Sequence, residues 1–96
     1  MIVFLGAMDN TELDVYRTKI SKIDDMVIDL LIERFELTDK VGMFKRKNNI
    51  PIENKDVEKR IIARLVARGD NKVDGKLILK VYSEIFKHSK ERQEKL

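Results

Sequence analysis

The sequence predicts an all-α protein of three helices, and three observations support this. Its 96 residues include only one Pro and four Gly. Apolar residues recur with the 3.6-residue period of amphipathic helices, and two short polar segments separate the periodic stretches. We expect helices over about 11–47, 54–68 and 74–95. At this length, 11–96 forms one helical domain rather than two.

The first helix is expected to start at Thr11, because Thr11 and Asp14 have the spacing of a capping box. From there to Lys47 only Gly42 interrupts good helix formers. Such a helix of about 36 residues is about 54 Å long. A compact domain of this size has a radius of gyration of only about 13 Å, so the rest of the chain cannot wrap the rod. A partner chain is the simplest remedy.

The other two helices are delimited by turn residues. Asn and the residue before Pro disfavour helix, so 48–51 is predicted to be a loop. The second helix is expected to stop at Gly69, with a turn over 70–72. The third helix then begins near Asp74.

Residues 1–10 are expected to be a flexible or loosely docked leader. The apolar opening, MIVFLGAM, is too short for a signal sequence or a membrane span, so no membrane partner is expected. Absence of Cys fits a cytoplasmic location. With a single His as well, no metal site is expected.

Charge is spread along the chain rather than concentrated. The sequence has 20 Lys and Arg against 17 Asp and Glu, for a net charge of +3. Nucleic-acid-binding proteins usually gather their cations on one face, whereas here both signs alternate. We therefore expect no nucleic-acid partner.

Arg34 lies on the apolar face of the first helix, which is a costly place for a cation unless an anion answers it. Lys45 falls within about 20° of the same line. The apolar residues that share this face with Arg34 are Ile23, Val27, Leu30, Leu37 and Val41. A structural ion pair with Glu58 would also explain Arg34, and Lys45 could reach water along its stem.

Polar residues interrupt the apolar stripes of the other helices too. Glu58 lies within about 60° of the apolar positions of the second helix, and Ser89 and Gln93 continue the stripe of the third. Each has a simple alternative: Glu58 could cap its helix, and Ser89 and Gln93 could be solvated near the chain end. Together, however, they place an acid, a hydroxyl and an amide on core-facing stripes.

Arg17 lies about 25 Å along the first helix from Arg34 and is rotated by about 100°. It cannot join Arg34 within one helix. If two helices pair antiparallel across a two-fold axis, Arg17 of one chain approaches Arg34 and Lys45 of the other. A site with two guanidiniums and an ammonium suits a small dicarboxylate.

These residues also occur in the order and spacing of a known family. They comprise Arg17-x-Lys19-Ile20-Ser21-x-x-Asp24, Glu33-Arg34, Val41-Gly42-x-x-Lys45, Ile50-Pro51-Ile52, Glu58 and Ser89-x-x-x-Gln93. Over about residues 11–96 the chain resembles the all-helical AroQ-class chorismate mutases.

The resemblance implies an intertwined homodimer that converts chorismate to prephenate in phenylalanine and tyrosine biosynthesis. This rearrangement is intramolecular, so no cofactor is implied. By the same resemblance, Arg34 and the Arg17 of the other chain bind the two carboxylates, with Ser89 assisting. Lys45 and Gln93 donate to the ether oxygen, and Glu58 accepts from the ring hydroxyl.

The sequence departs from the family pattern at the start of the second helix. Asn54 and Val57 stand where an Asp and an Arg are usual. Asn54 can still hydrogen-bond a substrate hydroxyl or cap the helix, but Val57 removes a cation, and Arg60 follows one turn later.

Three other functions remain open at this point. An isochorismate pyruvate lyase shares the scaffold and eliminates pyruvate. A helical dimerisation or nucleic-acid-binding module would keep Arg34 in a structural ion pair and bind polyanions in a salt-dependent way. A regulatory remnant would keep the fold without turnover.

Overall fold

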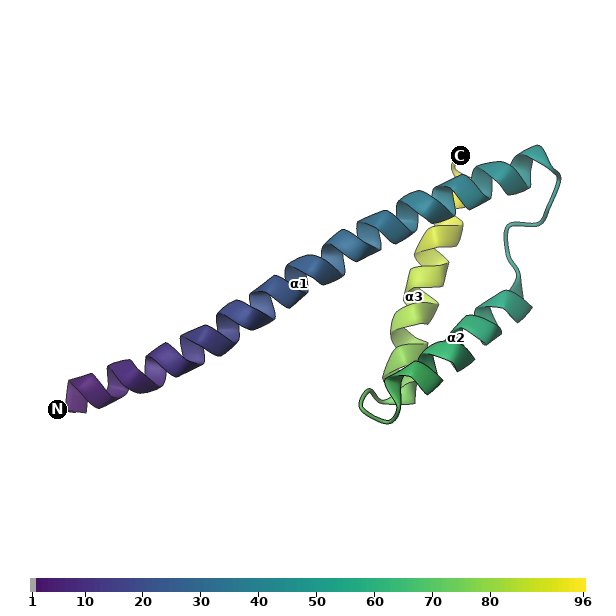
Figure 1. Ribbon diagram of the computed structural model, residues 1–96. Helices are drawn as coiled ribbons and strands as arrows, with labels where there is room; N and C mark the ends of the chain where they lie inside the picture. Colours follow the sequence, from purple (N-terminus) through teal and green to yellow (C-terminus); the bar gives the residue numbers. More distant parts are fainter. Residues whose placement is uncertain (1) are drawn as a thin grey trace. The chain divides into compact units, whose positions relative to one another are not determined.

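The computed structural model describes the backbone of residues 2–96 and the side chains from Asn10 onward. Three helices occupy this part of the chain: α1 (Ile2–Lys47), α2 (Lys55–Gly69) and α3 (Gly75–Glu94) (Figure 1). The described residues contain no strand. The predicted all-α fold of three helices is therefore confirmed.

The helix α1 starts earlier than the sequence predicts. It begins at Ile2 rather than at Thr11, so the capping-box spacing of Thr11 and Asp14 lies inside the helix and does not start it. Nothing between Ile2 and Thr11 breaks a helix except Gly6, and a single Gly is tolerated at a cost of about 1 kcal/mol. Met1 and the side chains of residues 2–9 lie outside the described part, so the leader over 1–10 stays a prediction.

The chain divides into two compact units, Met1–Arg34 and Phe35–Leu96. In the first unit, which is helical from Ile2, every side chain from Asn10 to Leu30 is exposed. The exposed set includes the apolar residues of the Arg34 stripe, such as Ile23, Val27 and Leu30. The described part of the single chain has no buried hydrophobic residue at all.

The second unit starts with the last turns of α1 and the loop that follows them. The Ile50 amide donates to the Lys45 carbonyl at 2.8 Å, and the Asn48 side chain donates to the Phe44 carbonyl at 2.8 Å. Asn49 takes the left-handed conformation with φ 56°, which Asn tolerates better than most residues. The predicted loop after Lys47 is confirmed, because these bonds satisfy carbonyls that the end of α1 leaves open.

Helix α2 begins as expected but ends differently. Asn54 is its N-cap, and the Asn54 side chain accepts a hydrogen bond from the Val57 amide at 3.2 Å. Gly69 is not the left-handed stop that the sequence suggested. Asp70 takes that conformation with φ 48°, followed by Asn71 with φ 59°, since short polar side chains tolerate it better than most other residues do.

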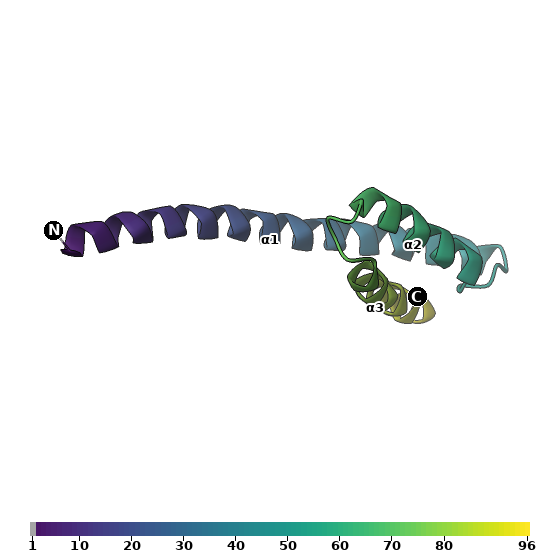
Figure 2. The same cartoon turned by 90° about the horizontal axis from the view of Figure 1, so that it is seen from below.

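Helices α2 and α3 form a hairpin around the turn over 70–74, which Figure 2 shows from below. The Asp74 side chain caps α3 by accepting from the Lys76 amide at 2.9 Å. The facing stripes, formed by Ile61, Ile62, Leu65, Ile78, Tyr82, Ile85 and Phe86, are half-buried. Within the described residues, no helix combines the length and hydropathy that a membrane span requires.

Candidate active site

Gln93 is the best-enclosed polar residue of the second unit, together with Ser89, and each is 7% exposed. The Gln93 side-chain nitrogen donates to the Thr38 carbonyl on α1 at 2.6 Å. A β-carbon built on Gly42 would lie only 2.6 Å from Gln93 Cγ. The last turns of α3 therefore sit directly on the backbone of α1, and Gly42 is the residue that permits this approach.

Ser89 lies one turn before Gln93 on the same face of α3. Its hydroxyl oxygen is buried and makes no hydrogen bond within the described part of the chain. A buried hydroxyl without a partner costs about 1–3 kcal/mol. A ligand oxygen would remove that cost, and the family resemblance implies a binding role for Ser89.

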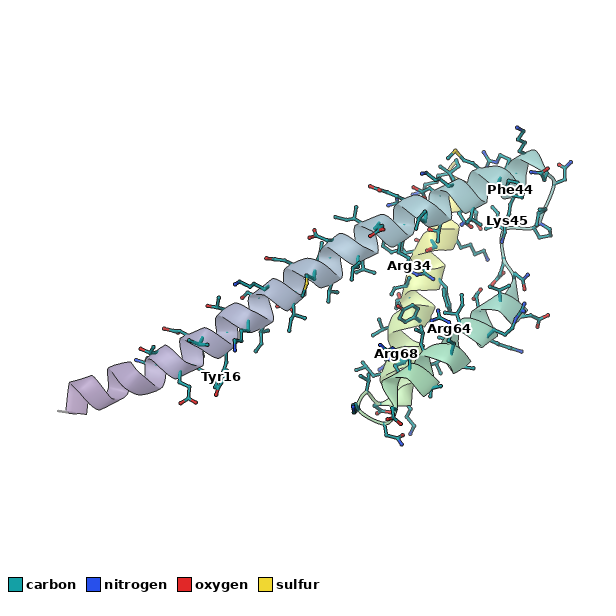
Figure 3. The ribbon with its side chains drawn as sticks, viewed as in Figure 1. Tyr16, Arg34, Phe44, Lys45, Arg64 and Arg68 are labelled. Atoms are coloured by element: carbon teal, nitrogen blue, oxygen red, sulfur yellow. The ribbon has the colours of Figure 1, made fainter. Side chains whose placement is uncertain are left out.

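Lys45 lies near the C-terminal end of α1, one turn beyond Gly42 (Figure 3). Its ammonium donates to the Ile52 carbonyl at 2.8 Å and is half-buried. An ammonium carries three donors, so one bond to the loop fixes the head group and leaves two for a ligand. The loop thus holds Lys45 back from bulk solvent.

Glu58 and Asn54 belong to α2. Glu58 is half-buried and lines a hollow of about 320 Å³ between α2 and α3, whose other lining residues include Ile62, Ser83 and Phe86. Asn54 is exposed, and its side-chain oxygen is used by the cap. The simple reading of Glu58 as a cap is wrong, because Asn54 has that role.

An ion pair lies beside Gln93. Arg92 binds Asp39 through two hydrogen bonds, Nη2 to Oδ2 at 2.6 Å and Nε to Oδ1 at 3.1 Å. The Arg92 hydrogen bonds hold the pKa of Asp39 below its ordinary value, and Asp39 raises the pKa of Arg92. The Arg92 guanidinium also lies 5.3 Å from the centre of the Phe35 ring, and the Phe35 and His88 rings form a T-shaped pair with their centroids 4.9 Å apart.

A separate pair of salt bridges stabilises the loop between α1 and α2. Glu53 binds Lys55 at 2.7 Å and Lys90 of α3 at 3.1 Å. These two ammonium groups hold the pKa of Glu53 below its ordinary value. Arg60, one turn after Val57, is exposed and donates to the Asp56 carbonyl of its own helix at 3.4 Å. Arg60 is therefore engaged with α2 itself.

The structure brings part of the predicted site together. Lys45, Ser89 and Gln93 lie within single helical turns of the contact between α1 and α3, and Glu58 lines the neighbouring hollow. Arg17 is exposed and Arg34 is half-buried, and both belong to the first unit. The assignment of a function to these residues stays a prediction.

Sequence reasoning missed two features of the site. Gly42 was noted as an interruption of the helix and as part of the family motif, but not as a packing contact, although a Gly inside a helix costs about 1 kcal/mol and so hints at a packing reason. The pairing of Asp39 with Arg92 left no signal, because 53 positions separate them. Among the described residues, no three His, Asp or Glu side chains are grouped as metal ligands would be.

The fold is that of an all-α protein with hydrogen-bond donors collected where α3 meets α1. A family model described as chorismate mutase type II matches residues 16–94. The chain therefore belongs to the chorismate mutase type II family, and the predicted resemblance is confirmed. Neither a curated protein nor a solved structure matches the chain significantly.

Proposed function

We propose that this protein is a chorismate mutase that rearranges chorismate to prephenate as a homodimer in the cytoplasm. The family supports the substrate and the reaction class. The observation that carries the proposal is the buried Gln93 amide, held on the Thr38 carbonyl and packed on Gly42, which lies one turn before Lys45 along α1. An amide and an ammonium held this way are donors that do not need to reorganise during a reaction.

The chemistry of the rearrangement suits these two donors. A C–O bond breaks while a C–C bond forms, so negative charge grows on the ether oxygen. Donors aimed at a developing charge stabilise the transition state more than the substrate, and this raises kcat. Lys45 keeps two N–H groups beyond its bond to Ile52, and Gln93 keeps one beyond its bond to Thr38. Neither residue acts as a nucleophile.

The substrate is a dicarboxylate, and the remaining residues fit its recognition. Arg34 binds one carboxylate, and the Arg17 supplied by the other chain binds the second. The unpartnered Ser89 hydroxyl assists. Glu58 accepts a hydrogen bond from the ring hydroxyl, and Asn54 lies at the start of the same helix. Holding the substrate in its compact, diaxial shape supplies the rest of the rate through orientation. No cofactor is part of this mechanism.

The dimer accounts for the exposed apolar surface. Exposed large hydrophobic residues occur along the whole described length of α1, including Leu13, Ile20, Met26, Leu30 and Leu37. Water contact at such a surface is unfavourable by about 25 cal/mol per Å². An antiparallel copy of α1 covers it and at the same time brings Arg17 to the site of the other chain. Residues 11–96 form the proposed functional domain.

The test is a chorismate-consumption assay on the purified protein and three variants, with prephenate identified by chromatography. We expect Lys45→Ala to lower kcat steeply. Arg34→Ala should raise KM and also lower kcat. Lys22→Ala, which removes an exposed cation of α1, is the matched control and should keep wild-type kinetics. Near-normal turnover in Lys45→Ala would overturn the mechanism.

Val57 raises the question of a second activity, because it replaces a cation usual in the family and is 39% exposed. Isochorismate pyruvate lyases use the same scaffold, so the missing cation leaves the identity of the substrate to be tested. Incubation with isochorismate separates the two activities, because a lyase releases pyruvate and salicylate. We expect prephenate from chorismate and no pyruvate from isochorismate.

A further inference from the structure

We infer that Asp39 and Arg92 are positioning residues that fix the Gln93 amide for catalysis. This inference rests on the proposed function, because it concerns how a donor of that reaction is held. Neither Asp39 nor Arg92 is assigned to contact the substrate. Their effect is transmitted through the last turns of α3.

Two adjacent contacts join α3 to α1. Arg92 and Gln93 are neighbours on α3, and their partners Asp39 and Thr38 are neighbours on α1. Successive residues of a helix point about 100° apart. The two contacts therefore reach α1 at positions about 100° apart around its axis. Together they resist both rotation and sliding of α3 at this point.

The ion pair of Asp39 with Arg92 is rigid. Two parallel hydrogen bonds from a planar guanidinium to a carboxylate define orientation as well as distance. Phe35, one turn before Asp39, holds the same guanidinium from its ring face at 5.3 Å. Thr38 also donates its hydroxyl to the Phe35 carbonyl at 3.1 Å. Residues 35–39 thus form one contact surface for Arg92 and Gln93.

The Gln93 side chain has little room to change its conformation. Its Cγ already lies at the backbone of Gly42, where a single added β-carbon would approach to 2.6 Å. A glutamine side chain has three rotatable bonds, and losing their freedom costs about 1.5–2 kcal/mol. Because Arg92 holds α3 in place, the Gln93 side chain is confined against α1 before the substrate binds. Without the ion pair of Arg92 with Asp39, the Gln93 amide can leave Thr38 and adopt other rotamers.

The experiment is a double-mutant cycle between Asp39→Asn and Gln93→Ala. We expect Asp39→Asn alone to lower kcat about tenfold with KM within about twofold, because lost orientation costs rate rather than binding. In the Gln93→Ala background, Asp39→Asn should change kcat less than twofold. Glu91→Gln removes an exposed carboxylate next to Arg92 and should leave kcat unchanged.

A purely structural ion pair would behave differently. Asp39→Asn would then lower the melting temperature and kcat in both backgrounds, and the kinetic effects would add, which would overturn the inference. Exchange of charges in Asp39→Arg with Arg92→Asp should recover part of the lost kcat. No recovery combined with additive effects would count against positioning.

A second readout does not depend on the reaction. The side-chain NH₂ signals of Gln93 in an amide NMR spectrum are identified by their loss in Gln93→Ala. In the wild type we expect them to be shifted and slow to exchange, as for a buried amide bonded to a carbonyl. Asp39→Asn should move them toward the values of free glutamine. Unchanged signals would overturn the positioning role, even if the protein has no mutase activity.

Discussion

Gln93 and Gly42 are packed so closely that α1 has no room for even one methyl group at position 42. The distance from an added β-carbon to Gln93 Cγ would be 2.6 Å, and to Gln93 Cβ 3.0 Å. This relationship joins Gly42 of α1 to a proposed catalytic amide on α3. It leads to the first prediction.

Gly42→Ala should displace Gln93 and lower kcat about tenfold or more. Replacing a helical Gly gains about 1 kcal/mol of helix propensity, whereas overpacking costs about 1–3 kcal/mol. The melting temperature should therefore change little or fall modestly while turnover falls clearly. Steady-state kinetics with thermal unfolding checks this.

Gly75→Ala is the matched control for Gly42→Ala. A β-carbon there would meet Val66 at 3.5 Å, an ordinary contact distance. We expect wild-type kinetics and equal or higher stability. Equal losses of turnover in both variants would show that Gly42 has no special relation to Gln93.

Val57→Arg should lower KM for chorismate. Val57 is 39% exposed on the first turns of α2, so a longer side chain is accommodated. A partly exposed cation near a carboxylate contributes about 0.5–1 kcal/mol, which corresponds to about a twofold to fivefold lower KM. Val73→Arg, at an exposed turn position, is the control and should leave KM unchanged. An unchanged KM in Val57→Arg would mean that this position does not face the substrate.

Acid should weaken the protein partly through Asp39. Its folded-state pKa lies below the ordinary value near 3.8, chiefly because of the Arg92 hydrogen bonds, with the charge of Arg92 and His88 adding to the effect. As the pH falls below about 5, the unfolded chain therefore binds more protons than the folded protein does. The free energy of unfolding decreases through this range. Glu36 also faces Arg92 and supports its charge.

Asp39→Asn should therefore show a shallower loss of stability on acidification than the wild type. Urea unfolding between neutral pH and the acid limit of the native state measures that slope. Arg92→Gln, which removes the partner instead of the carboxylate, should flatten the slope in the same direction. A slope as steep as that of the wild type in both variants would contradict the prediction.

Leu30→Glu should disrupt the proposed dimer. Leu30 is 63% exposed in the single chain and lies on the stripe of Arg34. A carboxylate without a partner in an apolar interface costs about 3–5 kcal/mol. Sedimentation should show twice the 11.3 kDa chain mass for the wild type and a shift to monomer for the variant.

Lys22→Gln is the control for Leu30→Glu, because it makes the same change in net charge at an exposed polar position of α1. It should remain dimeric. A wild-type protein that sediments as a monomer would contradict the antiparallel pairing and the sharing of Arg17 between chains.

Local patterns in the sequence determined the helices, their approximate bounds and the family. Apolar periodicity marks α2 and α3, and Asn54 and Asp74 cap them as turn chemistry predicts. The start of α1 escaped prediction because a capping-box spacing can also occur inside a helix. The end of α2 escaped because Asp70, rather than Gly69, took the left-handed position.

Tertiary structure alone decided how the site is held. The contact of Gln93 with Thr38 and Gly42, and the pairing of Arg92 with Asp39, join residues more than 50 positions apart. Such contacts depend on how two helices lie against each other, which periodicity within one helix does not specify. Periodicity could place Lys45, Ser89 and Gln93 on apolar stripes, but only the packing of α3 on α1 brought them to one place.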